Sequence, residues 1–242
     1  MSQIPSIFEQ AEMLIPPFPW DKPRTHRADG EKVVLIHGLW RGFHAMEPLA
    51  RRLQSAGYST LNLPYPSSRK PIDWIVPRLR SQIEEFAEGD QVHLVTHSLG
   101  GILARAMLSA PPPWKVGKLV MIAPPNGGSE IVDWAQNKRL FLAFLGPAGR
   151  ELGTDGVPLK LPQLPAGLEA AVIMGRKSKI NFFHKVLQPE NDGVVSVEYG
   201  KIEGLKGFTV VDGDHTFIQI HPDTIRQVLH FLKEGTLQKE IA

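Results

Sequence analysis

The chain has 242 residues, 42% of them hydrophobic, which suits one domain with a sizeable core. Its formal net charge is only +2 and no block of like charge occurs, which argues against a nucleic-acid partner. It contains no cysteine, so disulfides and thiolate metal sites are excluded and a reducing compartment is allowed. We therefore expect a globular protein of the cytoplasm.

The first thirty residues stand apart by their prolines and end at Asp29-Gly30. They lack the basic start and long apolar centre of a signal peptide, and no apolar run in the chain reaches the length of a membrane span. We predict that residues 1–30 form an irregular arm packed on a single domain, residues 31–242. Four large apolar side chains are available to pin this arm, namely Phe8, Leu14, Phe18 and Trp20.

Short apolar runs alternate with amphipathic segments after the arm. The apolar runs predict buried strands at 33–36, 58–63, 92–95 and 118–123. Segments with apolar positions three and four apart predict helices at 46–56, 73–86 and 99–108. This alternation implies right-handed crossovers, and hence an α/β fold with a mainly parallel sheet flanked by helices on both faces.

Residues 129–166 interrupt this alternation of strands and helices. Helical patterns at 131–136 and 138–145 are followed by a loop rich in glycine and proline. Residues 140–145, LFLAFL, are apolar nearly all round, which suits either a lid over an acyl pocket or a helix packed on the domain. We predict a small helical, cap-like insertion. After the insertion, the sequence again predicts strands, at 168–174 and 208–211, and a last helix at 222–233.

A single hydroxyl, Ser98, separates a predicted strand from a predicted helix. So sharp a reversal strains its central residue and requires small residues two positions away. Gly100 meets this requirement, whereas Thr96 stands where glycine is usual. The turn would expose the serine beside the unpaired N–H of Leu99, where an acyl oxyanion could be stabilised. The alternative is a serine that only caps the helix.

Ser98, Asp192 and His215 follow one another in the chain, each just past a predicted strand. The carboxyl ends of parallel strands meet at one edge of a sheet, which predicts a catalytic triad there. His215 would take the serine proton, and Asp192 would orient the imidazole. Asp155, which also precedes glycine, is the alternative acid. His221 is the alternative base, although its place before Pro222 favours a helix cap.

Four motifs in the right order carry a resemblance to a known family. They are VVLIHGLW at 33–40, THSLGG at 96–101, NDGVVSV at 191–197 and DHTFI at 214–218. They resemble the oxyanion strand and loop, the nucleophile elbow, the acid loop and the histidine loop of α/β-hydrolases of the bacterial lipase and esterase type. The resemblance implies hydrolysis of carboxylic esters, although it does not identify the ester.

The resemblance also implies roles for several further residues. The backbone N–H groups of Leu39 and Leu99 would form the oxyanion hole, and His37 would order the oxyanion loop. His97 would act as a spacer of the elbow. Trp40 and Arg41 would line the mouth of the substrate pocket, or else pack on the surface.

No cofactor or metal is expected. The dinucleotide-binding pattern G-x-G-x-x-G is absent, and Asp212 and Asp214 resemble a cation site only superficially. The expected partner is a small-molecule acyl ester or lipid, with short-to-medium chains favoured by the apolar residues near Ser98. Acyl transfer or thioester hydrolysis with the same triad, and a non-catalytic scaffold on the same fold, are the alternatives. The sequence leaves the oligomeric state open.

Overall fold

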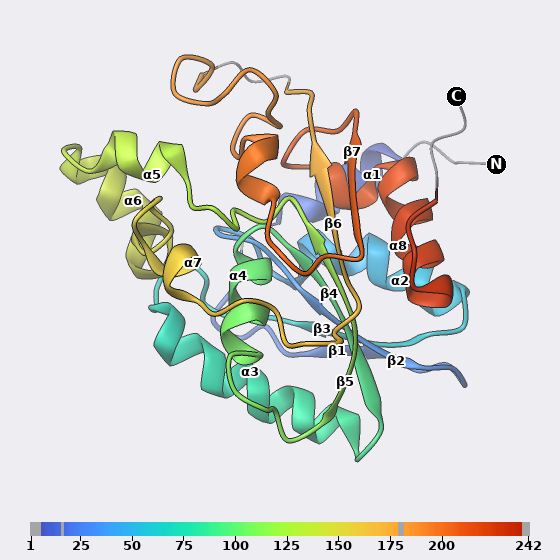
Figure 1. Ribbon diagram of the computed structural model, residues 1–242. Coiled ribbons are helices and arrows are strands. Elements are labelled where there is room, and N and C mark those ends of the chain that lie inside the picture. Colours follow the sequence, from blue (N-terminus) through green and yellow to red (C-terminus); the bar gives the residue numbers. More distant parts are fainter. Residues whose placement is uncertain (1–5, 16, 179–181, 239–242) are drawn as a thin grey trace.

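The computed structural model describes residues 6–15, 17–178 and 182–238. Their centre is one seven-stranded sheet with the strand order β1-β3-β2-β4-β5-β6-β7 (Figure 1). Its strands are β1 Arg24–His26, β2 Lys32–Ile36, β3 Ser59–Leu63, β4 Gln91–His97, β5 Lys115–Ile122, β6 Ala170–Gly175 and β7 Gly207–Val211. Neighbouring strands are parallel, except that β1 pairs antiparallel with β3. The predicted mainly parallel sheet is confirmed.

Helices cover both faces of this sheet, as predicted. Helices α3 (Ile72–Ala87) and α4 (Leu99–Met107) lie on one face, and α2 (Glu47–Ser55) and α8 (Pro222–Glu234) lie on the other (Figure 1). Successive side chains of a strand point to opposite faces, so the apolar run of β2 contributes to both cores. Val34 packs with the α3 and α4 side, and its neighbour Leu35 packs with the α2 and α8 side.

Residues 6–15 and 17–30 are more regular than predicted. Ser6 and Glu9 form a capping box that starts helix α1 (Ile7–Met13), and β1 extends the sheet at its edge. The sequence signal for this helix is the Ser-x-x-Glu spacing, which lets the two side chains each accept a backbone N–H. The expectation of an irregular segment is therefore wrong over these elements.

The side chains that attach this N-terminal segment to the rest of the protein also differ from the predicted ones. Phe8 and Trp20 are 86% and 73% exposed, so these side chains do not pin the segment, and Leu14 and Phe18 are exposed as well. Met13 is buried instead, while Glu12 and Glu9 form ion pairs with Arg51 and Arg52 of α2. The division of the chain into an arm, 1–30, and a domain, 31–242, stays a prediction.

The segment between β5 and β6 contains the predicted helical insertion. Its helices are α5 (Glu130–Ala135), α6 (Arg139–Arg150) and α7 (Val157–Lys160). The loop predicted to begin at Gly146 is partly helical, which corrects the sequence-based expectation. The non-helical backbone of Gly146, with a φ of 71°, kinks α6. Only glycine fits at this kink, because an added Cβ would overlap the Ser68 carbonyl. Pro147 then starts a new turn, where its missing N–H costs nothing.

Three short 3₁₀ helices complete the described part of the fold. They are η1 (Phe43–Met46), η2 (Val197–Gly200) and η3 (Ile218–Ile220). Within the described ranges, no helix is long and apolar enough to cross a bilayer.

Candidate functional site

Ser98 lies in the predicted sharp turn between β4 and α4. Its φ of 52° and ψ of −122° are strained for a residue with a side chain. The turn brings α4 so close to the end of β2 that a Cβ on Gly100 would lie 2.8 Å from the His37 carbonyl oxygen. Glycine is therefore required at that position, as the sequence predicts.

Thr96 occupies the position where glycine is usual, and the turn forms nonetheless. Its side chain is fully buried, and its hydroxyl lies 3.5 Å from the Val120 carbonyl oxygen of the neighbouring strand β5. The branched side chain thus finds space between β4 and β5.

Three side chains from distant parts of the chain meet at this turn. His215, in the loop after β7, has its Nε2 3.0 Å from the Ser98 hydroxyl oxygen. Its Nδ1 lies 2.7 Å from Asp192 Oδ2. An ionised carboxylate can only accept, so Nδ1 carries the proton and Nε2 is the acceptor for the Ser98 hydroxyl. This is the arrangement that a serine nucleophile and its base require.

The loop after β6 holds Asp192 in place. Its Oδ1 accepts the backbone N–H groups of Val194 and Val195, at 3.0 and 2.8 Å, and the residue is 1% exposed. Its carbonyl oxygen also accepts the His215 backbone N–H at 3.0 Å, which ties the acid loop to the histidine loop. The alternative acid, Asp155, is exposed before α7 and makes no hydrogen bond to His215.

The alternative base, His221, lies away from Ser98. Its Nδ1 accepts the backbone N–H of Asp223 at 3.3 Å, at the start of α8. The predicted helix cap is therefore confirmed.

Asp212 and Asp214, which resembled a cation site, have other partners. Asp212 pairs with Lys177 and Arg176, and these two cations hold its pKa down at about 2. Asp214 accepts the backbone N–H groups of Thr216 and Phe217 and so orders the histidine loop. Among the described residues, no cluster of three potential metal ligands is present.

Two backbone N–H groups adjoin Ser98 without a hydrogen-bond partner in the described part of the chain. They belong to Leu39, in the loop after β2, and to Leu99, the first residue of α4. The two loops are in contact, since a Cβ on Gly38 would lie 3.0 Å from the Ser98 Cβ. Unpaired donors so placed can stabilise an oxyanion.

An apolar cavity of about 410 Å³ opens beside Ser98 and His215. Its wall includes Trp40 and Arg41, as predicted, together with side chains of α5 and α6. Trp40 stacks on Phe144 at 4.6 Å between ring centroids, and Phe141 meets Phe183 edge-on at 6.0 Å. The sequence indicated the α6 part of this wall through LFLAFL, but no pattern singled out Phe183 in its long loop.

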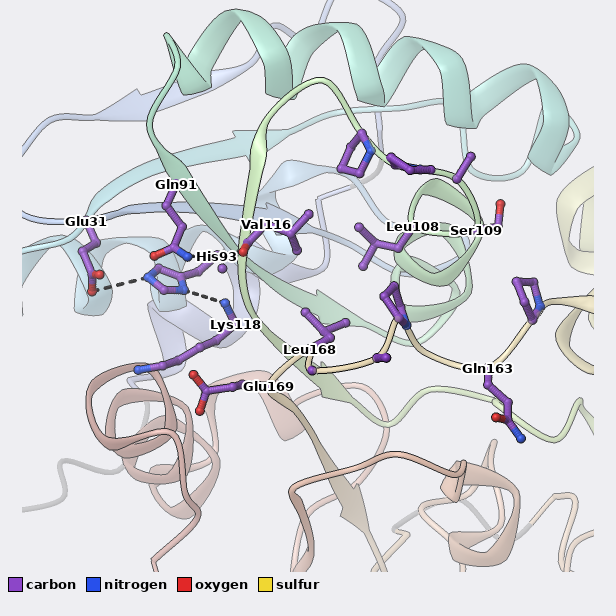
Figure 2. Close-up of a pocket in the computed structure, with 18 residues that line it drawn as sticks. Glu31, Gln91, His93, Leu108, Ser109, Val116, Lys118, Gln163, Leu168 and Glu169 are labelled. Carbon is purple, nitrogen blue, oxygen red and sulfur yellow. Dashed lines mark hydrogen bonds and ion pairs between the residues drawn. The ribbon is translucent and has the colours of Figure 1, made fainter.

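A larger cavity, of about 740 Å³, lies away from this site (Figure 2). It adjoins the amino ends of β4 and β5, where buried His93 accepts the Lys118 backbone N–H at 2.8 Å and faces Glu31 at 3.3 Å. Ligands of open parallel sheets bind beyond the carboxyl ends of the strands. The smaller cavity beside Ser98 is therefore the candidate active site.

Comparison with protein families decides the classification. A model of the alpha/beta hydrolase family matches residues 33–228, which spans the first parallel strand to the last helix. The chain belongs to the alpha/beta hydrolase family. It is thus a hydrolase of that superfamily, and the resemblance carried by the four sequence motifs is confirmed.

Solved structures share the fold of this hydrolase at low sequence identity. The mature Bacillus licheniformis lipase BlEst2 is 17% identical with a TM-score of 0.73, over 89% of this chain and 98% of that one. The metagenomic carboxyl esterase MGS0156 is 18% identical with a TM-score of 0.63, over 85% and 74%. Phospholipase PlaB from Legionella pneumophila is 15% identical with a TM-score of 0.67, over 86% and 61%. Comparison with curated proteins found no match.

His97 does more in this hydrolase than separate the elbow from the strand. Its Nε2–H donates to the His215 carbonyl oxygen at 3.0 Å, so it braces the backbone of the histidine loop. Burial, and then the charges of His215 and Arg41, hold the pKa of His97 well below its usual value. A neutral ring suits this contact. The adjacency of two histidines 118 residues apart has no signature in the sequence.

His37 connects the oxyanion loop to the chain after β3. Its Nδ1–H donates to the Gly38 carbonyl oxygen at 2.8 Å, and its Nε2 accepts the Tyr65 backbone N–H at 3.4 Å. The two rings stack, and the Tyr65 hydroxyl donates to the His37 carbonyl oxygen. Burial lowers the pKa of His37 to about 4, because a charged ring would lose its hydration there.

We expect this buried imidazole to make the folded protein sensitive to acid. In the unfolded chain this histidine has an ordinary pKa of about 6.5, whereas in the folded protein its pKa is about 4. Between these two values the unfolded chain binds a proton at this position and folded His37 stays neutral. The free energy of unfolding should therefore fall as the pH drops through this window. The His37 contribution between about pH 7 and about pH 5 is about 2 kcal/mol.

Urea denaturation at those two pH values measures this loss in the wild type and in His37→Gln, whose amide keeps a donor and an acceptor. The drop should be about 2 kcal/mol smaller in the variant. Equal drops in the two proteins would contradict the assignment of the acid sensitivity to His37.

Proposed function

We propose that this chain is a serine hydrolase that cleaves carboxylic esters through an acyl-enzyme. The observation that carries the proposal is the hydrogen-bonded series Ser98–His215–Asp192, with distances of 3.0 and 2.7 Å, at the edge of an apolar cavity. A serine held only as a helix cap would not need this series, and Ser98 makes no capping hydrogen bond.

The first half of the reaction forms the acyl-enzyme. Ser98 Oγ attacks the ester carbonyl carbon while His215 Nε2 takes the hydroxyl proton. The carbonyl oxygen becomes an oxyanion, which the N–H groups of Leu39 and Leu99 stabilise. Asp192 stabilises the imidazolium that has formed. When the tetrahedral intermediate collapses, the bond to the alcohol oxygen breaks, and the imidazolium returns the proton to that alcohol.

The second half releases the acid. A water molecule gives a proton to His215 Nε2 and attacks the acyl carbon, forming a second oxyanion in the same place. Collapse of this intermediate breaks the bond to Ser98 Oγ, which regains its proton from His215. The enzyme returns to its starting state, and one ester and one water have become one acid and one alcohol.

The cavity favours an acyl ester or lipid substrate of short to medium length. Its volume of about 410 Å³ and its aromatic wall suit an apolar chain better than a polar one. Structural neighbours named as a lipase, a carboxyl esterase and a phospholipase support the same class of chemistry.

A fluorescent fluorophosphonate tests the proposal without knowledge of the substrate, because it labels only an activated serine. The expected result is one adduct, mapped by peptide mass spectrometry to Ser98 and absent from Ser98→Ala. Folded protein that gains no adduct, with or without detergent to open the cavity, would contradict the proposal.

A further inference from the structure

One charged side chain is unusual among those around the candidate active site. Arg41 is the only arginine, lysine, aspartate or glutamate that lines the 410 Å³ cavity among the described residues. It lies two positions after Leu39, in the loop that also bears Trp40. The rest of the wall is largely apolar, so a cation here requires an explanation.

Arg41 has no counter-ion. In the described part of the chain, no carboxylate forms an ion pair with it, and its guanidinium donates no hydrogen bond. Its charge is one of the effects that lower the pKa of the buried imidazoles of His37 and His97. Burial lowers the pKa of Arg41, with no opposing effect from a carboxylate. A partly buried charge without partners is costly.

Another buried arginine shows how the fold otherwise treats such a group. Arg105 also lacks a carboxylate, but it donates to the Asn126 backbone and side-chain oxygens at 3.2 Å and to the Pro158 carbonyl oxygen at 3.0 Å. Its role is to link α4 to the insertion. The Arg41 side chain has no such contacts, and its backbone N–H lies 3.4 Å from the Gly38 carbonyl oxygen.

The backbone of this loop is itself strained. Trp40 has a φ of 60°, which costs energy for a residue with a large side chain. Its ring stacks on Phe144 of α6 and so forms part of the apolar wall next to Arg41. The loop therefore places an apolar surface and an unpaired cation side by side at the edge of one cavity.

We propose that Arg41 binds an anionic group of the substrate, so that the preferred ester carries a carboxylate, phosphate or sulfate besides its apolar part. The planar guanidinium fork matches the two oxygens of such a group. The apolar wall would hold the hydrocarbon part, and the ester carbonyl would lie at Ser98. This inference rests on the proposed ester hydrolysis.

Two pairs of matched substrates test it. The first pair places the charge in the alcohol half, as 4-butyryloxybenzoate against 4-butyryloxybenzamide. The second pair places it in the acyl half. It compares the monophenyl ester of glutaric acid, which has a free carboxylate, with the phenyl ester of glutaric acid monoamide, in which an amide replaces that carboxylate. The quantity measured is kcat/KM for the anionic ester divided by kcat/KM for its neutral partner.

In Arg41→Gln this ratio should fall about 10-fold to 100-fold in at least one pair, as expected for loss of a charge-assisted contact. Arg41→Lys, which keeps the charge without the fork, should lose less. The matched control is Arg139→Gln, which removes an exposed charge on α6 outside the cavity and should leave both ratios unchanged. The pair that responds shows which half of the substrate bears the anion.

An unchanged ratio in both pairs, with hydrolysis of the neutral esters intact, would overturn the role of Arg41 and leave the proposed function standing. An equal fall of the ratio in Arg41→Gln and Arg139→Gln would overturn this role too, since it would indicate only an effect of the overall electrostatic field of the protein. Absence of hydrolysis of all four esters, together with absence of fluorophosphonate labelling at Ser98, would overturn the proposed function and this inference with it.

Discussion

Replacing Ser98 by alanine is expected to lower kcat/KM for a carboxylic ester by about 10³-fold or more. The variant loses the nucleophile, while the N–H groups of Leu39 and Leu99 and the apolar cavity remain. A residual rate above that of the uncatalysed reaction should therefore persist. Steady-state hydrolysis of p-nitrophenyl esters of graded chain length measures the effect.

The substitution should leave the fold intact, because the only hydrogen bond of the Ser98 hydroxyl among the described residues is to His215 and removing the hydroxyl creates little space. Alanine keeps the Cβ in the strained turn, so an unchanged thermal unfolding transition is the control. A variant that is folded and retains near wild-type hydrolysis would mean that Ser98 is not the nucleophile.

Replacing His215 by alanine is expected to reduce turnover to a similar extent, about 10³-fold. Without the His215 imidazole, Ser98 has no group to take its proton. Oδ2 of buried Asp192 loses its hydrogen-bond partner, although Oδ1 keeps the backbone N–H groups of Val194 and Val195. The pair His215→Ala and His221→Ala separates the candidate base from the candidate helix cap.

His221→Ala should retain turnover close to that of the wild type. Its expected cost is in stability, about 1 kcal/mol from the loss of the cap at the start of α8. Ester hydrolysis and urea denaturation of both variants measure the two effects. Loss of turnover in His221→Ala with retention in His215→Ala would reverse the assignment of the base.

The sequence by itself determined the parallel sheet and the edge at which the site lies. Apolar runs predicted six of the described strands, and the predicted helices differ from the described ones by a residue or two at most boundaries, except α6, which ends at Arg150 rather than 145. Helices α1 and α7 were not predicted. These signals are local, since burial on both faces leaves a continuous apolar run and an amphipathic helix leaves a 3.6-residue period. The strand β1 was missed, because three residues at a sheet edge carry no such period.

The sequence predicted the order of the candidate triad residues along the chain, but it could not predict the contacts between them. Both Asp192 and Asp155 stand before glycine in loops past strands, and only the resemblance of NDGVVSV to an acid loop favoured Asp192. The tertiary structure brings Asp192 to 2.7 Å from His215 because β6 and β7 are neighbours in the sheet and their loops share a hydrogen bond. Strand order is a property of the whole chain.

Only the tertiary structure decided the environment of each side chain. His97 was predicted to be a spacer, yet its ring braces the His215 backbone from a position 118 residues away. Arg41 was predicted to lie at the pocket mouth, but its lack of a counter-ion depends on which carboxylates folding brings near it. Sequence periodicity reports which face of an element is buried, whereas charge pairing depends on distances between elements that only the folded chain sets.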